Sequence, residues 1–234
     1  MSDWKKTLSL SLVVIVGMVI GMCIFTALED DLSYADSFSL CFQIGSTIGY
    51  GNFTPKTAGG QLFSVTMALC GIPVFFWLLK QLGEHMLNGQ KLVITKIEAK
   101  LFKHGEPRFL PEKCVFIAAI IACLIVVVGA VIQQRDENWK FLHGVYCFVI
   151  TLTTIGFGDL IPSHPTSVAM QMFKLFYTYF GLCVMANIIL GAFEVQESVE
   201  ILKKKLCSRY YQRSRMMEDE HDIVRECDMR TESV

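Results

Sequence analysis

Hydrophobic residues are gathered into four long stretches without a charged side chain, residues 8–28, 61–79, 114–132 and 175–193. Each is close to the roughly 20 residues that an α-helix needs to cross a bilayer. Lys5 and Lys6 before the first stretch would also suit a signal peptide, but the length of the stretch and the lack of a small-residue cleavage site favour a retained helix. The pattern predicts an all-α membrane protein with four transmembrane helices.

Two shorter stretches lie between the long ones, and each is followed by the same kind of pentapeptide. Residues 34–46 and 139–153 are predicted helices that are too short to cross a bilayer, the first capped by Ser33 or Asp36. After them come Thr-Ile-Gly-Tyr-Gly at 47–51 and, 107 positions later, Thr-Ile-Gly-Phe-Gly at 154–158. The chain therefore repeats the order helix, re-entrant pore helix, pentapeptide loop, helix.

Each pentapeptide has the chemistry of a potassium selectivity filter. A dehydrated K⁺ ion is wrapped by backbone carbonyls, and glycine tolerates the backbone angles that aim them inward. Isoleucine is expected to pack behind each filter, and the aromatic residue to brace it. The predicted filters are Thr47, Ile48, Gly49, Tyr50 and Gly51, and Thr154, Ile155, Gly156, Phe157 and Gly158. K⁺ is expected at the first four residues of each, and Asn52 and Asp159 flank them.

Charge assigns the two sides of the membrane. Hydrophobic residues make up 53% of the chain and the mean hydropathy is +0.45. Basic side chains gather between the second and third helices and after the fourth, which predicts cytoplasmic segments there. Acidic residues near each pentapeptide would raise the cation concentration at an outer mouth. We therefore expect a multi-pass protein of the plasma membrane with both termini in the cytoplasm.

The expected division is a first pore module over residues 1–87, a cytoplasmic basic linker over 88–113, a second pore module over 114–195 and a cytoplasmic tail over 196–234. Nine cysteines lie mostly in apolar stretches and lack zinc-site spacing, so neither a disulfide framework nor a metal cluster is indicated. No nucleophile, base and orienting group stand at a recognisable spacing, so no enzyme is predicted. No cofactor beyond permeant K⁺, and no nucleic acid, is expected.

With these motifs, and with Gly71-Ile72-Pro73 in the second apolar stretch, the chain resembles the two-pore-domain potassium leak channels. The resemblance implies passive K⁺ conduction that stabilises a negative resting potential. A filter needs four strands and the chain supplies two, so a homodimer with a pseudo-fourfold pore is expected, with a heterodimer of related subunits as a further option. Only residues 29–35 stand where that family usually has a long extracellular cap, so the cap is expected to be missing.

Some positions have two interpretations. Gly71 and Gly181 suit a gating hinge or close helix packing, and Pro73 predicts a kink or local break. Asn187 suits either the inner cavity or a bond to a neighbouring helix. Gly45 weakens the end of its pore helix and predicts that the first filter is the softer one.

The function also leaves alternatives open. The basic run Lys203, Lys204 and Lys205 suits contact with anionic lipid or simple positive-inside anchoring. His143 and His164 are either outer-mouth proton sensors or solvated loop residues. A non-conducting regulatory subunit and a weakly selective cation channel are the alternative functions.

Overall fold

The computed structural model describes residues 2–102, 110–161 and 168–231. Within these ranges the regular secondary structure is helical throughout. The helices are α1 (Ser2–Leu28), α2 (Tyr34–Gly45), α3 (Ala58–Phe102), α4 (Leu110–Asp136), α5 (Phe141–Leu152) and α6 (Val168–Thr231). This confirms the predicted all-α class.

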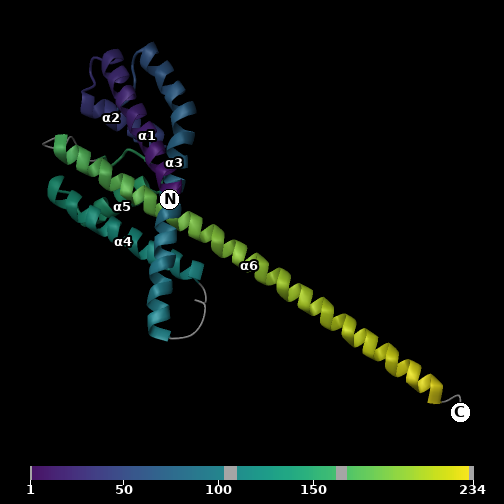
Figure 1. Ribbon diagram of the computed structural model, residues 1–234. Coiled ribbons are helices and arrows are strands. Elements are labelled where there is room, and N and C mark those ends of the chain that lie inside the picture. The colour runs from purple at the N-terminus through teal and green to yellow at the C-terminus, as the bar shows by residue number, and fades with distance from the viewer. Residues whose placement is uncertain (1, 103–109, 162–167, 232–234) are drawn as a thin grey trace. The chain divides into compact units, whose positions relative to one another are not determined.

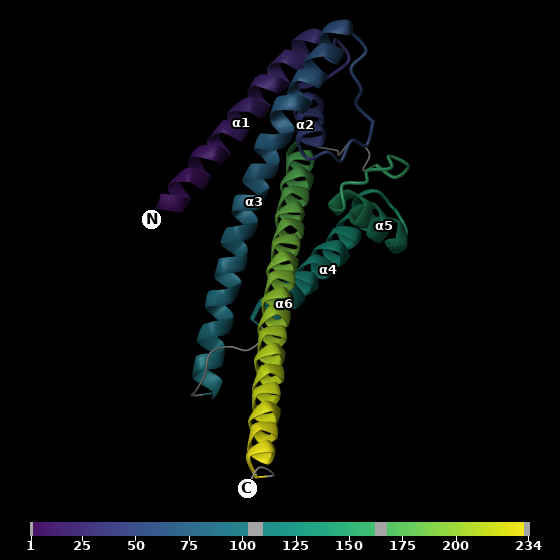
Figure 2. The ribbon, with the colours of Figure 1, turned by 90° about the vertical axis from the view of Figure 1, so that its right-hand side faces the viewer.

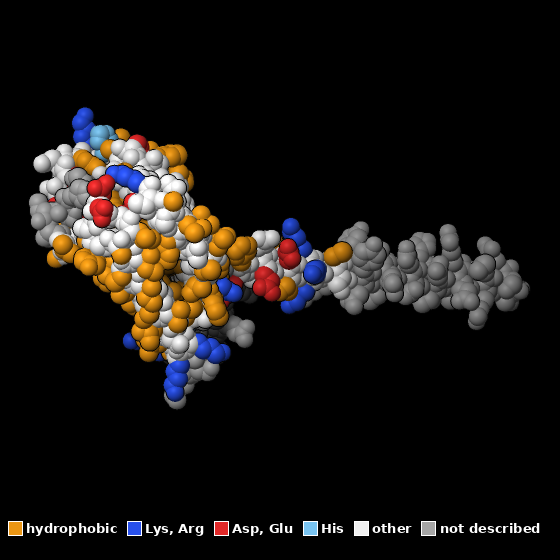
Figure 3. Space-filling view, turned by 90° about the horizontal axis from the view of Figure 1, so that it is seen from above, with side chains coloured by type: hydrophobic (Ala, Val, Ile, Leu, Met, Phe, Trp, Pro, Cys, Tyr) orange, Lys and Arg blue, Asp and Glu red, His pale blue; other side chains and the backbone are white. Residues whose placement is uncertain are grey.

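Four of these helices, α1, α3, α4 and α6, are long and apolar enough to cross a membrane. They contain the four predicted stretches and extend beyond them. Few of their apolar residues are buried within the chain; Leu8, Leu62 and Phe116, for example, are each about two-thirds exposed or more. Figure 3 shows hydrophobic side chains over much of the visible face. An apolar outer surface is what a bilayer requires of a protein that crosses it, so the chain is a multi-pass membrane protein.

The first half of the repeat packs α2 against α1 and the beginning of α3 (Figure 1). Phe25, Cys41, Phe42 and Phe75 are buried in its core. The helix α2 begins where Ser33 caps it, since the Ser33 hydroxyl accepts a hydrogen bond from the backbone N–H of Asp36 at 3.3 Å. Of the two predicted caps, Ser33 is therefore the one used.

The second half packs α5 against α4 (Figure 2). The helices approach closely because small residues face each other: a Cβ on Gly144 would lie 2.8 Å from the Cα of Ala130. The described α5 begins at Phe141, two residues after the predicted start, and Lys140 precedes it without a side-chain cap.

The first part of α6 joins the halves. Asn187 is 1% exposed, and its Nδ2 donates to the carbonyl of Gly83 in α3 at 3.3 Å. Gln171 Nε2 donates to the hydroxyl of Ser39 in α2 at 2.9 Å, and the Tyr177 hydroxyl donates to the Ile125 carbonyl in α4 at 2.6 Å. These bonds span more than 50 sequence positions each and fix α6 between both halves.

The chain divides into two compact units, residues 1–191 and 192–234, and α6 runs from one into the other. In the first unit, α3 continues through residue 87, the expected end of the first pore module, to Phe102. Pro73 lies inside α3 without interrupting the helix. Of the two alternatives predicted at Pro73, a kink or a local break, the described helix shows no break, and the kink stays a prediction.

Candidate ion-filter site

The two pentapeptides follow α2 and α5 with nearly the same backbone. In the first filter strand, residues 47–51, φ is +58° at Thr47, +57° at Gly49 and +79° at Gly51. In the second filter strand, residues 154–158, φ is +57° at Thr154, +52° at Gly156 and +75° at Gly158. Residues with a positive φ thus alternate with residues that have a negative φ. This alternation turns successive carbonyls toward one side, as the coordination of a cation by carbonyls requires.

The left-handed threonines were not predicted, because only glycine adopts a positive φ without steric cost. Thr47 and Thr154 stand two residues before the first glycine of each strand. The glycines themselves are two residues apart, and continuing that spacing backwards would have predicted a positive φ at the threonines. A strained backbone of this kind persists only where the surrounding structure holds it.

The two filter strands lie side by side. A Cβ added to Gly156 would collide with the carbonyl oxygen of Ile48, and one added to Gly158 would collide with that of Tyr50. Glycine is therefore required at 156 and 158 for the approach of the strands as well as for φ. A Cβ on Gly49 or Gly51 meets no atom of the described residues within 4 Å.

The first strand is braced by the pore helix of the other half. The Tyr50 hydroxyl bonds to Thr151 Oγ1 in α5, and Thr151 itself donates to the Cys147 carbonyl at 2.7 Å. Because the single Thr151 proton is used there, Tyr50 is the donor. Ile48 is 3% exposed behind the strand.

The second strand lacks this support within the chain. Ile155 is 51% exposed and Phe157 is 65% exposed. The expected packing of the isoleucine and the aromatic residue is thus seen for the first strand. For Ile155 and Phe157 it stays a prediction, because no described element of the same chain covers these two side chains.

Both flanking residues are held by their own pore helix. Gln43 Nε2 in α2 donates to Asn52 Oδ1 at 3.0 Å. The Tyr146 hydroxyl in α5 donates to Asp159 Oδ2 at 3.0 Å. The exit from each filter strand is thus fastened to the helix that leads into it.

Glu29, at the end of α1, holds the loop that leads from the first filter strand to α3. It is 4% exposed, and its carboxylate accepts from the Thr57 hydroxyl at 2.7 Å and from the backbone N–H groups of Lys56 and Thr57 at 3.0 Å each. The Thr57 hydroxyl, with these N–H groups and the Lys56 charge, keeps the pKa of the Glu29 carboxyl below its ordinary value of 4.5, against the opposing effect of burial. The absence of a side chain at Gly60 makes space for the Glu29 carboxylate, since a Cβ at this position would collide with it.

The first and second halves also match a known protein family. A model of that family, described as "Ion channel", matches residues 8–88 and again residues 115–195, which together exceed half of the chain. Each match covers a pore helix, a filter strand and parts of the two long helices beside them. The chain belongs to the two-pore-domain potassium channel family. This family consists of channels rather than enzymes.

Curated relatives agree with this membership. Potassium channel subfamily K member 4 of Mus musculus is 35% identical over 158 residues, 65% of this chain and 40% of the relative. Potassium channel subfamily K member 2 of Rattus norvegicus is 34% identical over 161 residues, 65% of this chain and 37% of the relative. Potassium channel subfamily K member 10 of Mus musculus is 36% identical over 128 residues, which are 53% of this chain and 24% of the relative. The chain thus spans two fifths or less of the length of these relatives.

The two glycines Gly71 and Gly181 have different surroundings. A Cβ on Gly181 would collide with Leu152 and lie 3.5 Å from Ile125, whereas one on Gly71 meets only Met67, at 3.7 Å. Close packing therefore accounts for Gly181 but not for Gly71. Gly45, expected to soften the first filter, lies against Phe75, whose Cδ2 would be 3.3 Å from an added Cβ.

Of the remaining predicted positions, Asn187 bonds to Gly83, the second of its two interpretations. Lys203, Lys204 and Lys205 are exposed in the second unit, and their contact with lipid stays a prediction. His143 is exposed, and His164 lies outside the described residues.

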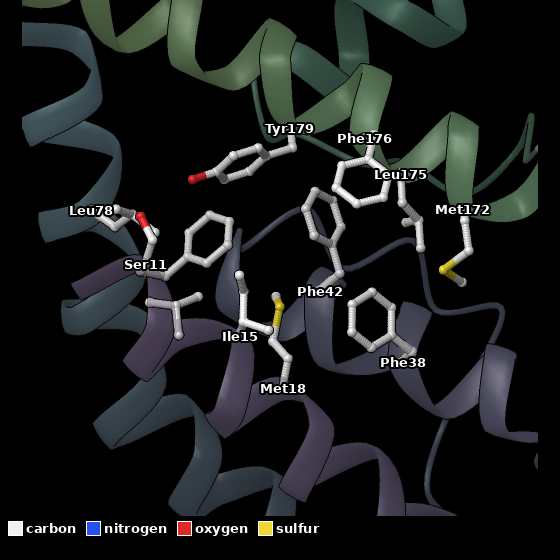
Figure 4. A pocket seen from close by; sticks show the side chains of 12 residues that line it. Ser11, Ile15, Met18, Phe38, Phe42, Leu78, Met172, Leu175, Phe176 and Tyr179 are labelled. Atoms are coloured by element: carbon white, nitrogen blue, oxygen red, sulfur yellow. The ribbon is translucent and has the colours of Figure 1, made fainter. Parts of the chain in front are cut away.

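An apolar pocket of about 340 Å³ lies between α1, α2, α3 and the first part of α6 (Figure 4). Met18, Phe38 and Phe42 line one side of it, and Met172 and Tyr179 the other. Ser11 contributes the one hydroxyl besides that of Tyr179. Such a lining, apolar apart from these two hydroxyls, suits hydrocarbon better than a cation.

Proposed function

We propose that the chain forms a K⁺-selective leak channel, which lets K⁺ cross the membrane passively and so stabilises a negative resting potential. The observation that carries this proposal is the pair of filter strands, which share one alternation of left-handed residues and lie in contact. Their carbonyls, with the hydroxyls of Thr47 and Thr154, would replace the water around a dehydrated K⁺ ion. Passive conduction needs no cofactor, and the permeant ion is the only ligand.

The site residues proposed are those of both filter strands, with Asn52 and Asp159 at the exits. The relatives' names describe potassium channels, which supports K⁺ as the ion here. No apolar stretch carries the regularly spaced arginines of a voltage sensor. This favours a background conductance over a voltage-gated one.

Two copies of the chain would supply the four strands of a pore, so we propose a homodimer, with a heterodimer of related subunits as a further assembly. The proposed location is the plasma membrane, with both termini in the cytoplasm. The exposed Lys203–Lys205 run would then face the anionic inner leaflet.

The test is the reversal potential of whole-cell current from the chain expressed alone, at several external K⁺ concentrations with Na⁺ plus K⁺ held constant. A K⁺-selective channel gives a shift of the reversal potential of about 59 mV per tenfold change in external K⁺, the Nernst slope for a univalent ion at 25 °C. Gly156→Ala is the comparison variant, because its methyl group would collide with the Ile48 carbonyl and should remove the current, measured per chain present at the surface.

Two other results would contradict the proposal. Surface expression without current would mean a regulatory subunit that acts only beside a relative. A clearly shallower slope would mean a weakly selective cation channel.

A further inference from the structure

The pair of filter strands has one closed junction and open outer edges. The carbonyls of Ile48 and Tyr50 cover the glycine edge of the second strand, at Gly156 and Gly158. The equivalent edge of the first strand, at Gly49 and Gly51, meets no described atom within 4 Å. The far side of the second strand is open as well, since Ile155 and Phe157 are more than half exposed. The chain therefore presents half of a closed ring.

The closed junction is polar. Tyr50 donates to Thr151, so a hydroxyl of the first strand is satisfied by a hydroxyl of the second pore helix. The repeat offset of 107 gives each partner a counterpart, Phe157 for Tyr50 and Ile44 for Thr151. Neither counterpart has a hydroxyl. The pair is therefore polar at one position of the repeat and apolar at the other.

We propose that a second copy of this chain closes the ring by packing its Phe157 against Ile44, so that the junction within a chain is polar and the junction between copies is apolar. The proposal rests on the proposed function, which takes the pore to contain two copies. In a ring of alternating first and second strands, the contact of Tyr50 with the next pore helix recurs at every junction in the same rotational sense. Its next occurrence joins Phe157 to Ile44 of the second copy.

The surroundings of these side chains suit that contact. Ile44 is partly buried and packs at the edge of the core of the first half, near the end of α2. Phe157 is 65% exposed, a large apolar area for a residue beside a pore. The same rotation brings the carbonyls of the second strand against the open edge at Gly49 and Gly51.

The two single substitutions should differ in cost. Phe157→Tyr adds a hydroxyl that faces the apolar Ile44 and leaves it buried without a partner. Ile44→Thr adds a hydroxyl that can bond to the carbonyl four residues earlier in its own helix, as Thr151 does with Cys147. Both changes together rebuild the Tyr50–Thr151 pair between copies.

The first test is a double-mutant cycle on K⁺ current per channel at the surface. We expect Phe157→Tyr to lower the current about tenfold, the equivalent of ~1.4 kcal/mol, and Ile44→Thr to restore it to within about twofold of wild type. Tyr50→Phe with Thr151→Val is the matched pair within the chain and should also couple. Independent, multiplying effects at 157 and 44 would overturn the proposal.

The second test needs no current. The photoreactive residue p-benzoylphenylalanine replaces Phe157 in one of two differently tagged, co-expressed full-length copies, which are irradiated in the membrane. We expect a covalent product that carries both tags, with the adduct on the peptide that contains Ile44. The same residue at Tyr50 should instead give an adduct within one copy, on the peptide with Thr151.

Adducts from position 157 that stay within one copy, or that miss the Ile44 peptide, would overturn the pairing. A chain that gives the expected adduct but carries no current would contradict only the proposed conduction. The two failures are thereby distinguishable.

Discussion

The two halves of the repeat place an acidic residue at the same point and hold it by different means. Glu29 directly follows α1, and Asp136, 107 positions later, is the last residue of α4. Glu29 is held by neutral donors, the hydroxyl and N–H groups at the start of α3. Asp136 and its neighbour Glu137 instead hold Lys174 of α6, at 2.5 and 2.9 Å.

The difference shows what each half needs to fasten. In the first half the buried acid secures the loop behind a filter strand. In the second half it secures a spanning helix. The repeat therefore preserves the position of the acid, while the partner follows from the element that has to be held there.

The filter strands differ in the same manner. The first is braced within its own chain by Thr151, whereas the aromatic residue of the second is exposed. Sequence alone predicted a softer first filter because of Gly45. Gly45 lies against Phe75, and the strand that lacks support in the single chain is the second. The softness of the first filter stays a prediction.

The largest effect is expected from Gly156→Ala. Its methyl group would collide with the Ile48 carbonyl at a residue whose φ is +52°. Strain at such a position costs about 1–3 kcal/mol before the collision is added, so we expect at least a roughly 100-fold loss of current and a lower unfolding temperature of the purified chain.

Gly49→Ala sharpens this comparison. Its edge is open within the single chain, so it should lower the dimer fraction in size-exclusion chromatography and leave the helix content unchanged by circular dichroism. Equal effects of both substitutions on the fold of the chain would contradict the distinction between closed and open edges.

The next effect concerns the buried acids of the second half. Lys174→Met leaves Asp136 and Glu137 without their cation, and breaking a buried ion pair on one side costs about 3–5 kcal/mol. Thermal unfolding in detergent should show a clear loss of stability. Lys56→Met is the control, because Lys56 and Asp31 pair at 2.7 Å while both are 72% exposed; a loss as large as that of Lys174→Met would contradict the assignment.

A smaller pair of opposite effects is expected at the inner-helix glycines. Gly181→Ala pushes a methyl group into Leu152 and should destabilise the chain by about 1–3 kcal/mol, the usual cost of overpacking. A methyl group from Gly71→Ala meets only Met67, at the ordinary contact distance of 3.7 Å, so this change should stabilise α3 by up to about 1 kcal/mol. Chemical unfolding of both variants measures the sign of the change in the free energy of unfolding. A Gly181→Ala variant more stable than wild type would contradict a packing role for Gly181.

The smallest change is expected at Glu29, and it depends on pH. The folded state lowers the pKa of this carboxyl, so its contribution to stability is complete above the ordinary value of 4.5 and is lost as pH falls through the lowered pKa. The unfolding temperature should therefore drop in acid below about pH 4.5.

Glu29→Gln should remove part of that drop and lower the unfolding temperature slightly at neutral pH. Asp30→Asn at the neighbouring exposed position is the control and should leave the acid transition unchanged. An unaltered transition in Glu29→Gln would show that other carboxyls cause it.

Sequence alone determined the parts of this protein that depend on local pattern. Charge-free stretches of bilayer length gave four helices, because an apolar helix is the stable form of a chain that must satisfy its own backbone in lipid. The repeated pentapeptide located both filter strands, and Ser33 was among the predicted caps. These features need only the types of residue and their spacing.

The tertiary structure decided which partner each residue meets. Tyr50 with Thr151, Glu29 with Thr57, and Lys174 with Asp136 join positions separated by 101, 28 and 38 residues, a separation that no local pattern encodes. The left-handed φ of Thr47 and Thr154 likewise depends on neighbouring elements that hold a strained backbone in place. Local propensity therefore fixed the elements, and packing between distant segments fixed the site.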